Sequence, residues 1–322
     1  MGLTVALGQA RSVPGDLAAN LATAVRLVRE ASAAGARLLA LPELFTCGYD
    51  PAAVAAAGPG LLLAAPPPGT VPADGSPLAP LARAAAGTGM WVVLGAALTA
   101  PGDDGSGGPA ERRPANAVLV LDPAGAVRGR YAKAHLWGPE RDVFAPGGEL
   151  VAVEADGVRI GLGICYDAGF PEFARAHRRA GAHALLYCSA FAEGATEHRY
   201  DVYHPARAVE NGVYTLVSNA VGDLAGERYF GRSGAWHPDG RPLTALGAGD
   251  GVRVVTVAPE ETARVRAGLP YLDELRADLL GTATAPPSLT VLRSSAAASA
   301  TPSRTTVHPP TGAPHAARLP RR

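Results

Sequence analysis

The chain has 322 residues, of which 48% are hydrophobic and 18% are charged, and its formal net charge at pH 7 is zero. This length and apolar content suffice for a large buried core, in one large domain or two small ones. Since the sequence has neither a basic stripe nor a polybasic segment, we expect no nucleic-acid partner and no membrane partner.

The sequence also lacks the patterns of export, membrane insertion and metal binding. Its first residues carry no positive charge and enter a strand pattern at once, so we expect no signal peptide. No apolar run reaches the roughly 18–20 residues of a membrane-spanning helix. Three cysteines are too few for a disulfide framework, and no His-Glu-x-x-His or paired Cys-x-x-Cys pattern indicates a metal site. We therefore expect a cytoplasmic protein.

Apolar strands and helices alternate in the first half of the chain. Asp16 is a suitable N-cap for a helix over about 16–34, which Gly35 ends. Turn-forming residues at 122–125 predict a hairpin between two strands. The Ala-, Gly- and Pro-rich stretch 51–80 and the loop 101–114 are expected to be irregular. The expected strands are 3–7, 37–41, 91–98, 116–121 and 126–132, with a second helix at about 78–86.

The second half continues the alternation, which predicts the α/β class with a sheet made mixed by its hairpins. Residues 1–281 are expected to form the folded part. From 282 to 322 the chain is Ala, Ser, Thr, Pro and Arg without periodicity, which predicts a disordered tail. The expected strands are 150–154, 158–164, 183–188, 213–219 and 252–257, and the expected helices are 171–180, 200–211 and 272–280.

Three polar residues stand out at the ends of apolar strands. Glu43 ends a buried strand, where a carboxylate is costly unless it is paired or used. Lys133 is the only lysine among 29 Lys and Arg residues, and a compact ammonium suits a point cation beside a developing oxyanion better than a guanidinium does. Cys165 follows a strand with Gly161 and Gly163, at a strand-to-helix turn where open α/β sheets usually bind ligands.

These residue types together permit covalent acyl transfer. A deprotonated thiol is a strong nucleophile, and a carboxylate can take its proton and later pass it to a leaving amine. An ammonium, with the backbone N–H of Tyr166, can stabilise the tetrahedral oxyanion. Because no histidine is obviously paired with the cysteine, a papain-like arrangement is disfavoured.

Each of these residues also has a structural interpretation. Taken alone, Cys165 would more often be an inert core thiol, and Glu43 a helix cap or a paired core carboxylate. Taken alone, Lys133 could be a surface lysine retained by chance. Three further residues are interpreted as structural rather than catalytic: Cys47, Cys188 and His135.

In this order, the three segments resemble the carbon–nitrogen hydrolases of the nitrilase superfamily, whose catalytic set is Glu-Lys-Cys. The matching motifs are Leu-Pro-Glu43, Tyr-Ala-Lys133-Ala-His-Leu and Gly-Ile-Cys165-Tyr-Asp-x-x-Phe-Pro-Glu. Many members carry a second glutamate seven residues after the lysine, which is Glu140 here. The resemblance covers about residues 3–265. Further similarity lies in Ala206-Arg-Ala-Val-Glu210-Asn211, Asn219 and Phe230-Gly-Arg-Ser233.

The resemblance implies a four-layer α-β-β-α sandwich that assembles as a homodimer or higher homo-oligomer. It implies hydrolysis of a non-peptide C–N bond through a thioester on Cys165, with release of ammonia or an amine. Glu43 would be the general base, Lys133 would stabilise the oxyanion, and Glu140, the fourth candidate catalytic residue, would position the substrate or assist. No cofactor or metal is implied.

The implied substrate is a small primary amide. The start of the chain and the run 199–222 look most like the branch acting on ω-amino carboxamides such as 5-aminopentanamide. An N-carbamoyl compound is the first alternative, a nitrile the second, and a non-catalytic scaffold is the alternative from another class. The loop after the strand ending at 188 departs from the family, so Glu193 is expected either to pair with a cationic substrate tail or to be solvated. The candidate pocket residues are Tyr49, His135, Phe191 and Glu193.

Overall fold

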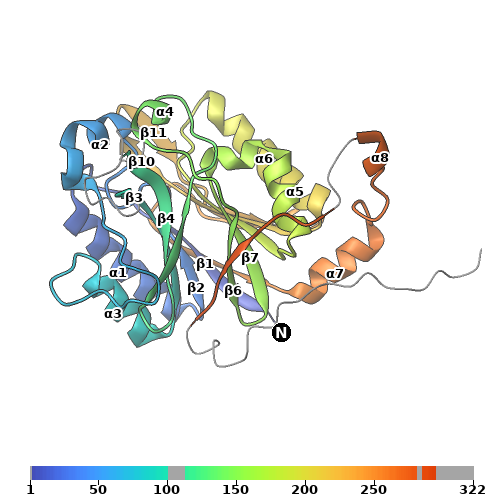
Figure 1. Cartoon of the computed structure of the whole chain (residues 1–322), viewed down its shortest axis with the longest axis horizontal. Helices are drawn as coiled ribbons and strands as arrows, with labels where there is room; N and C mark the ends of the chain where they lie inside the picture. Colours follow the sequence, from blue (N-terminus) through green and yellow to red (C-terminus); the bar gives the residue numbers. More distant parts are fainter. Residues whose placement is uncertain (1, 101–112, 281–284, 295–322) are drawn as a thin grey trace, which may run out of the picture.

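The computed structural model describes residues 2–100, 113–280 and 285–294. Two large sheets pack face to face, and helices cover the outer face of each (Figure 1). The fold is therefore the expected four-layer α-β-β-α sandwich of the α/β class. Part of the expected loop 101–114 and most of the expected tail lie outside the described residues.

The first sheet has six strands in the order β14-β1-β2-β3-β4-β5. Strands β1, β2 and β3 run parallel, and the other neighbours pair antiparallel, including the expected β4–β5 hairpin. The strand bounds are β1 Leu3–Gln9, β2 Leu38–Ala40, β3 Trp91–Leu98, β4 Ala115–Leu121, β5 Val127–Ala132 and β14 Gly251–Val257.

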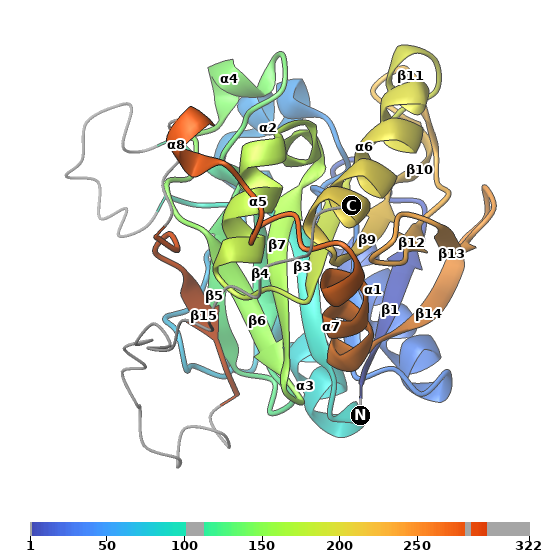
Figure 2. The ribbon, with the colours of Figure 1, turned by 90° about the vertical axis from the view of Figure 1, so that its right-hand side faces the viewer.

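The second sheet has seven strands in the order β13-β12-β9-β8-β7-β6-β15, with β7, β8 and β9 parallel. A separate hairpin, β10 with β11, lies at one end of the molecule (Figure 2). The bounds are β6 Val151–Ala155, β7 Val158–Ile164, β8 Ala184–Ser189, β9 Tyr214–Asn219, β10 Val221–Leu224, β11 Glu227–Phe230, β12 Gly234–Trp236, β13 Pro242–Ala245 and β15 Thr290–Leu292.

Helices α1 and α3 cover the first sheet, and α5 and α6 cover the second (Figure 1). The Asp16 side chain caps α1 as expected, accepting a hydrogen bond from the Ala19 N–H at 2.9 Å. The bounds are α1 Leu17–Ala33, α2 Pro51–Ala57, α3 Ala79–Thr88, α4 Glu140–Val143, α5 Pro171–Arg179, α6 Ala195–Asn211, α7 Pro259–Gly268 and α8 Ala277–Leu280, with short 3-10 turns at Gly58–Leu61 and Cys165–Gly169.

Successive side chains of β1 point to opposite faces of the first sheet, and this alternation explains why a core forms on each face. Val5 and Leu7 face the second sheet and pack with residues such as Ile160 and Leu186, whereas Ala6 belongs to the core beneath α1 and α3. Both faces of this strand are buried, as expected of a parallel strand covered on both sides. The continuous apolar pattern of the inner strands therefore follows from their central position.

Several elements differ from the sequence expectation. The stretch 51–80 is not wholly irregular, because Asp50 caps the short helix α2 through a 2.9 Å bond to the Ala53 N–H. Helix α6 begins at Ala195, earlier than expected, and α7 and the β10–β11 hairpin were not expected. The helix expected over 272–280 is restricted to the short α8.

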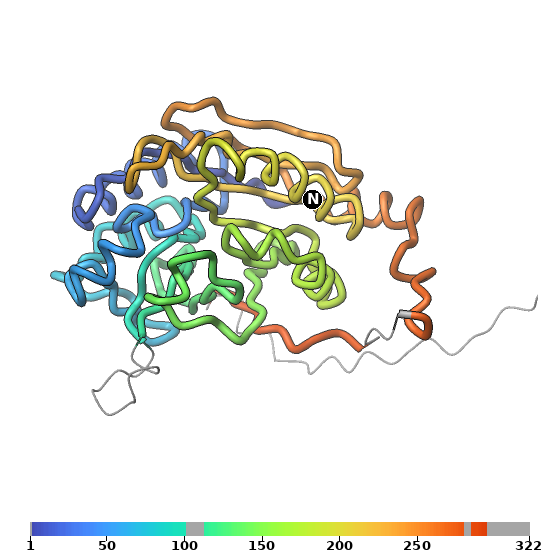
Figure 3. The backbone as a smooth tube through the Cα atoms, turned by 90° about the horizontal axis from the view of Figure 1, so that it is seen from above, coloured from blue at the N-terminus to red at the C-terminus, as the bar shows by residue number. Residues whose placement is uncertain are grey.

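The expectation of disorder is wrong for β15. Thr290–Leu292 pairs in parallel with β6, and the Thr290 N–H donates to the Leu150 carbonyl at 2.9 Å. Leu292 is buried, and the Arg293 guanidinium donates to Glu154 Oε1 at 2.9 Å. Figure 3 shows the segment before β15 running along one side of the molecule. The edge strand β6 provides the pairing partner for these residues. No local pattern in the tail reveals this partner.

Candidate active site

Three of the predicted residues meet at one end of the two sheets. Glu43 follows β2, Lys133 follows β5, and Cys165 follows β7. The Lys133 ammonium donates to Glu43 Oε1 at 2.6 Å and to Glu140 Oε1 at 2.8 Å. All three charged side chains are buried, so their charges act on one another with little screening by water.

The backbone presents Cys165 at a constrained turn. Its φ of 42° is unusual for a residue with a side chain, and such strain concentrates at functional sites. Asp167 fastens the turn, because its Oδ2 accepts hydrogen bonds from the Ile164 N–H at 2.9 Å and from the Tyr131 hydroxyl at 2.7 Å. The nucleophile position is therefore tied to β5, the strand that Lys133 directly follows.

Burial changes the ionisation of the cluster. Burial raises the pKa of Glu43 to about 7, helped by Glu140 and opposed by Lys133 and Asn116. Burial also raises the pKa of the Cys165 thiol well above its usual value, and Glu43 adds to this while Lys133 opposes it. Burial by itself would lower the pKa of Lys133, but the two carboxylates raise it, so the lysine stays charged.

The two glutamates differ in how fully they are bonded. Glu140 accepts hydrogen bonds from the Tyr49 hydroxyl at 2.6 Å and, through Oε2, from the Trp137 N–H at 3.0 Å. Glu43 Oε1 accepts from Lys133 and from the Asn116 amide at 2.7 Å. Among the described residues, Glu43 Oε2 is buried without a hydrogen-bond partner. Glu43 thus has an oxygen available to take a proton, and Glu140 does not.

Comparison with known proteins identifies the family that this arrangement belongs to. The family model described as carbon–nitrogen hydrolase matches residues 4–267. The chain belongs to the carbon–nitrogen hydrolase family. The curated relatives include amidases, and one structural neighbour is an amidase from the nitrilase superfamily.

Two curated relatives illustrate the similarity. The 2-oxoglutaramate amidase of Bacillus subtilis (strain 168) is 31% identical over 166 residues, which are 51% of this chain and 64% of the relative. The (R)-stereoselective amidase of a Pseudomonas species is 34% identical over 182 residues, which are 53% of this chain and 62% of the relative. The chain thus spans less than two thirds of the length of each of these two relatives.

A solved amidase from Nesterenkonia sp. AN1 has a similar fold over most of this chain. It superposes with a TM-score of 0.71 at 29% identity, over 87% of this chain and 98% of that one. In that structure, a mutant of the amidase carries the product of Michael addition of acrylamide at its active-site cysteine.

Cys165 of this carbon–nitrogen hydrolase opens into a pocket of about 250 Å³. Tyr49, Phe191 and Glu193, which the sequence analysis proposed as pocket residues, line it together with Tyr166. His135 does not line it. The imidazole of His135 stacks on Phe170 at 3.7 Å and lies 2.8 Å from Asp167 Oδ1, which is the scaffold position that the sequence favoured for it.

Some functional residues were missed at the level of sequence. Asn116, which bonds Glu43, is a lone polar residue at the start of an apolar strand, and this pattern was the available signal. Arg199 and Trp137 also line the pocket, and the sequence analysis singled out neither of these two residues. The other two cysteines, Cys47 and Cys188, are buried outside the pocket, and burial raises the pKa of Cys47 to about 11.

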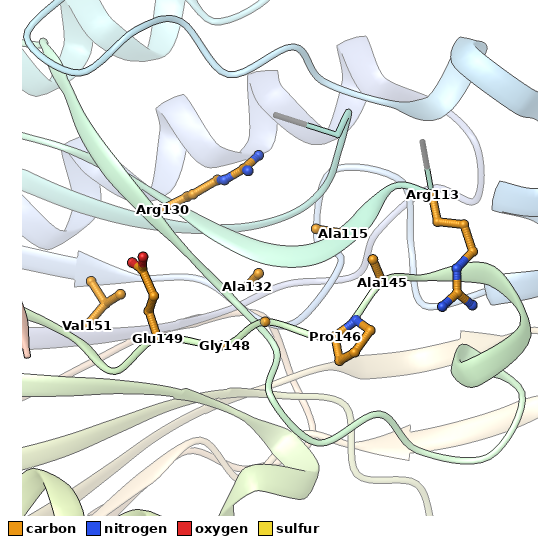
Figure 4. Close-up of a pocket in the computed structure, with 10 residues that line it drawn as sticks. Arg113, Ala115, Arg130, Ala132, Ala145, Pro146, Gly148, Glu149 and Val151 are labelled. Atoms are coloured by element: carbon orange, nitrogen blue, oxygen red, sulfur yellow. The ribbon is translucent and has the colours of Figure 1, made fainter. Parts of the chain in front are cut away.

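A second cavity of about 330 Å³ is lined by Ala132, by the residues 145–149 and by two arginines (Figure 4). Arg113 and Arg130 extend into it from separate positions and donate to the carbonyls of Arg141 and Thr99, at 2.7 and 3.2 Å. Its other lining residues are mostly small, and the cavity contains no nucleophile. The chemistry therefore concentrates in the Cys165 pocket.

The described ranges contain no cluster of three or more His, Cys, Asp or Glu side chains able to hold a metal ion. In the same ranges, no helix is long and apolar enough to cross a bilayer.

Proposed function

We propose that this protein hydrolyses small linear amides through a thioester on Cys165, releasing ammonia and a carboxylic acid. The observation that carries the proposal is the buried cluster of Glu43, Lys133 and Glu140 beside a constrained cysteine at a pocket. The amidase activities for which the relatives are named, and the cysteine adduct of the Nesterenkonia enzyme, support it.

Glu43 acts as the general base. Because burial brings its pKa to about 7, it can take the thiol proton near neutral pH, and its unpartnered Oε2 is the acceptor. The thiolate attacks the amide carbon, and the carbonyl π electrons move to oxygen. The resulting oxyanion is stabilised by the Lys133 ammonium and the Tyr166 N–H.

Collapse of the tetrahedral intermediate breaks the C–N bond, and protonated Glu43 gives its proton to the departing amine. Ammonia leaves, and the acyl group remains on Cys165 as a thioester. Glu43, again ionised, then takes a proton from a water molecule that attacks the thioester carbon. The carboxylic acid departs, and the thiolate recovers the proton from Glu43.

Glu140 holds the cluster in position. It takes bonds from Lys133, from the Tyr49 hydroxyl and from the Trp137 N–H, so it fixes both the ammonium and two residues of the pocket wall. We propose that Glu140 orients Lys133 and the substrate without exchanging a proton.

The ω-amino carboxamides that the sequence favoured remain a second candidate substrate class, because two acidic side chains, Glu193 and Glu227, line the pocket. We also retain as proposals that the protein acts in the cytoplasm, as a homodimer or higher homo-oligomer, and without a cofactor. The low number of cysteines supports the first point, and the family resemblance supports the other two.

The test is ammonia release across a panel of amides, N-carbamoyl compounds and nitriles. Cys165→Ala should abolish turnover of amides and prevent labelling of the site by acrylamide. Cys47→Ala, which removes a buried thiol outside the pocket, should keep both. Retention of a tenth of the wild-type activity by Cys165→Ala would refute the assignment.

A further inference from the structure

The pocket above Cys165 is lined by three charged side chains that the reaction does not use. Arg199 comes from α6, Glu193 from the segment before α6, and Glu227 from β11. The far end of the acyl group must meet one of these charges. Which of them is available to a ligand depends on the partners that each already has.

Glu193 is already neutralised. Its Oε1 lies 3.4 Å from the Arg228 guanidinium, and its backbone N–H donates to the Arg228 carbonyl at 2.8 Å. The Glu193 side chain is 54% exposed, so water also solvates its charge. A cationic substrate tail would therefore compete with an arginine and with bulk water for this carboxylate.

Glu227 is solvated as well. It lies on the exposed side of the β10–β11 hairpin and accepts a hydrogen bond from the Tyr229 hydroxyl at 3.3 Å. Ion pairs between groups exposed to this extent contribute about 0–1 kcal/mol. Neither acidic residue therefore provides a strong anchor.

Arg199 differs from both. It is half-buried, and its guanidinium carbon lies 5.4 Å from the centre of the Trp137 ring. The indole in turn packs edge-on against Tyr166 at 4.8 Å. Within the described residues, no carboxylate lies within 4.0 Å of the Arg199 guanidinium. The stacking orders the guanidinium without satisfying its charge or its planar set of donors.

We propose that Arg199 binds a carboxylate at the far end of the substrate, so that the preferred substrates are monoamides of short dicarboxylic acids. This inference rests on the proposed amide hydrolysis and specifies its substrate class. An arginine fork matches a carboxylate with two parallel hydrogen bonds, which makes the pair both strong and oriented.

The size of the pocket sets the length of the substrate. The 250 Å³ cavity equals roughly eight water volumes at about 30 Å³ each. A monoamide of a four- or five-carbon dicarboxylic acid has about that many non-hydrogen atoms. The aromatic side chains of Tyr49, Tyr203 and Tyr229 line the pocket and would contact its methylene groups.

The test compares three amides of equal chain length with different tails. They are glutaramate with a carboxylate, 5-aminopentanamide with an ammonium, and pentanamide with no charge. The variant is Arg199→Gln, and the matched control is Arg83→Gln, which removes the same charge from an exposed arginine of α3 outside the pocket lining.

We expect the wild type to have its highest kcat/KM on glutaramate. Arg199→Gln should lower that value roughly 10- to 100-fold, mainly through KM, since it removes a charge-assisted pair at a half-buried site. It should change pentanamide turnover less than about threefold. Arg83→Gln should leave the preference for glutaramate in place.

Equal losses on all three amides would overturn the proposal by giving Arg199 a purely structural role. A wild-type preference for 5-aminopentanamide that Glu193→Gln removes would overturn it in favour of the acidic side chains.

Protection of Cys165 from alkylation by glutarate provides a measurement that needs no turnover. Loss of protection in Arg199→Gln but not in Arg83→Gln supports the carboxylate site, and equal protection in both variants overturns it. If the wild type hydrolyses none of the amides, the proposed function fails, and this binding measurement still decides whether Arg199 recognises a carboxylate.

Discussion

Gly95 makes the placement of Glu43 open to a direct test. Gly95 lies in β3, where its carbonyl accepts a 3.2 Å hydrogen bond from the Thr46 N–H. A Cβ added at this position would lie 1.8 Å from the Pro42 carbonyl oxygen and 3.0 Å from the Glu43 Cα. Since real Cβ atoms essentially never come closer than 3.0 Å to such a neighbour, the Pro42–Glu43 peptide must move by more than 1 Å.

Such a movement would separate Glu43 from its partners. The carboxylate is held by bonds of 2.6 Å to Lys133 and 2.7 Å to Asn116, and neither survives a shift of that size. Misplacing a reacting group by 1 Å can cost about 100-fold in rate. We therefore expect Gly95→Ala to lower kcat about 100-fold on any amide that the wild type hydrolyses.

The cost in stability should be moderate. Overpacking a well-packed core costs typically about 1–3 kcal/mol, which for a domain of this size lowers Tm by roughly 2–12 °C. Circular dichroism and a thermal melt would show that the variant is folded when its rate is measured. Gly87→Ala is the matched control, because a Cβ there meets nothing within 4 Å. A Gly95→Ala enzyme within threefold of wild-type kcat would refute the argument that β3 positions the base.

Three further predictions follow from the same site and from the sheet edge. Lys133→Arg should lower kcat about 100- to 1000-fold, because the enclosed ammonium has no room for a guanidinium and an oxyanion donor is lost; near-normal steady-state kcat would contradict this. The hydrogen bond from the Asn116 amide lowers the pKa of Glu43, so Asn116→Ala should raise that pKa. Because the ionised base is the active form, the acidic limb of the kcat/KM profile should then move to higher pH. An unmoved limb in a pH–rate titration would show that Glu43 is not the titrating base. Truncation at residue 281 removes β15 and should lower Tm by several degrees. Leu292→Ala keeps the strand and should lower the free energy of unfolding by roughly 2 kcal/mol or less, because Leu292 lies at the sheet edge. An unchanged thermal melt for both variants would show that the strand does not stabilise the fold.

The sequence anticipated those parts of the molecule whose signals are local. The inner strands have both faces buried, so they appear as continuous apolar runs, and the cap at Asp16 lies beside the helix that it begins. The Glu-Lys-Cys motifs are local as well, because each combines a strand end with the polar residue that follows. Their agreement with one known family identified the fold without any long-range contact.

Only the tertiary structure determines those properties of the protein that depend on contacts between residues distant in the chain. The ionisation of Glu43 reflects Lys133, which lies 90 positions further along the chain, and the strand β15 exists because the edge of β6 is available to pair with it. The charges at the pocket show the same dependence. The sequence left Glu193 either as an anchor for a cationic substrate tail or as a solvated residue. In the folded chain Arg228 pairs with Glu193, whereas Arg199 has an aromatic support and no carboxylate partner within the described residues. A sequence specifies which charges are present, but only the folded chain determines which of them are neutralised, because Coulomb interactions depend on distance in space and on burial.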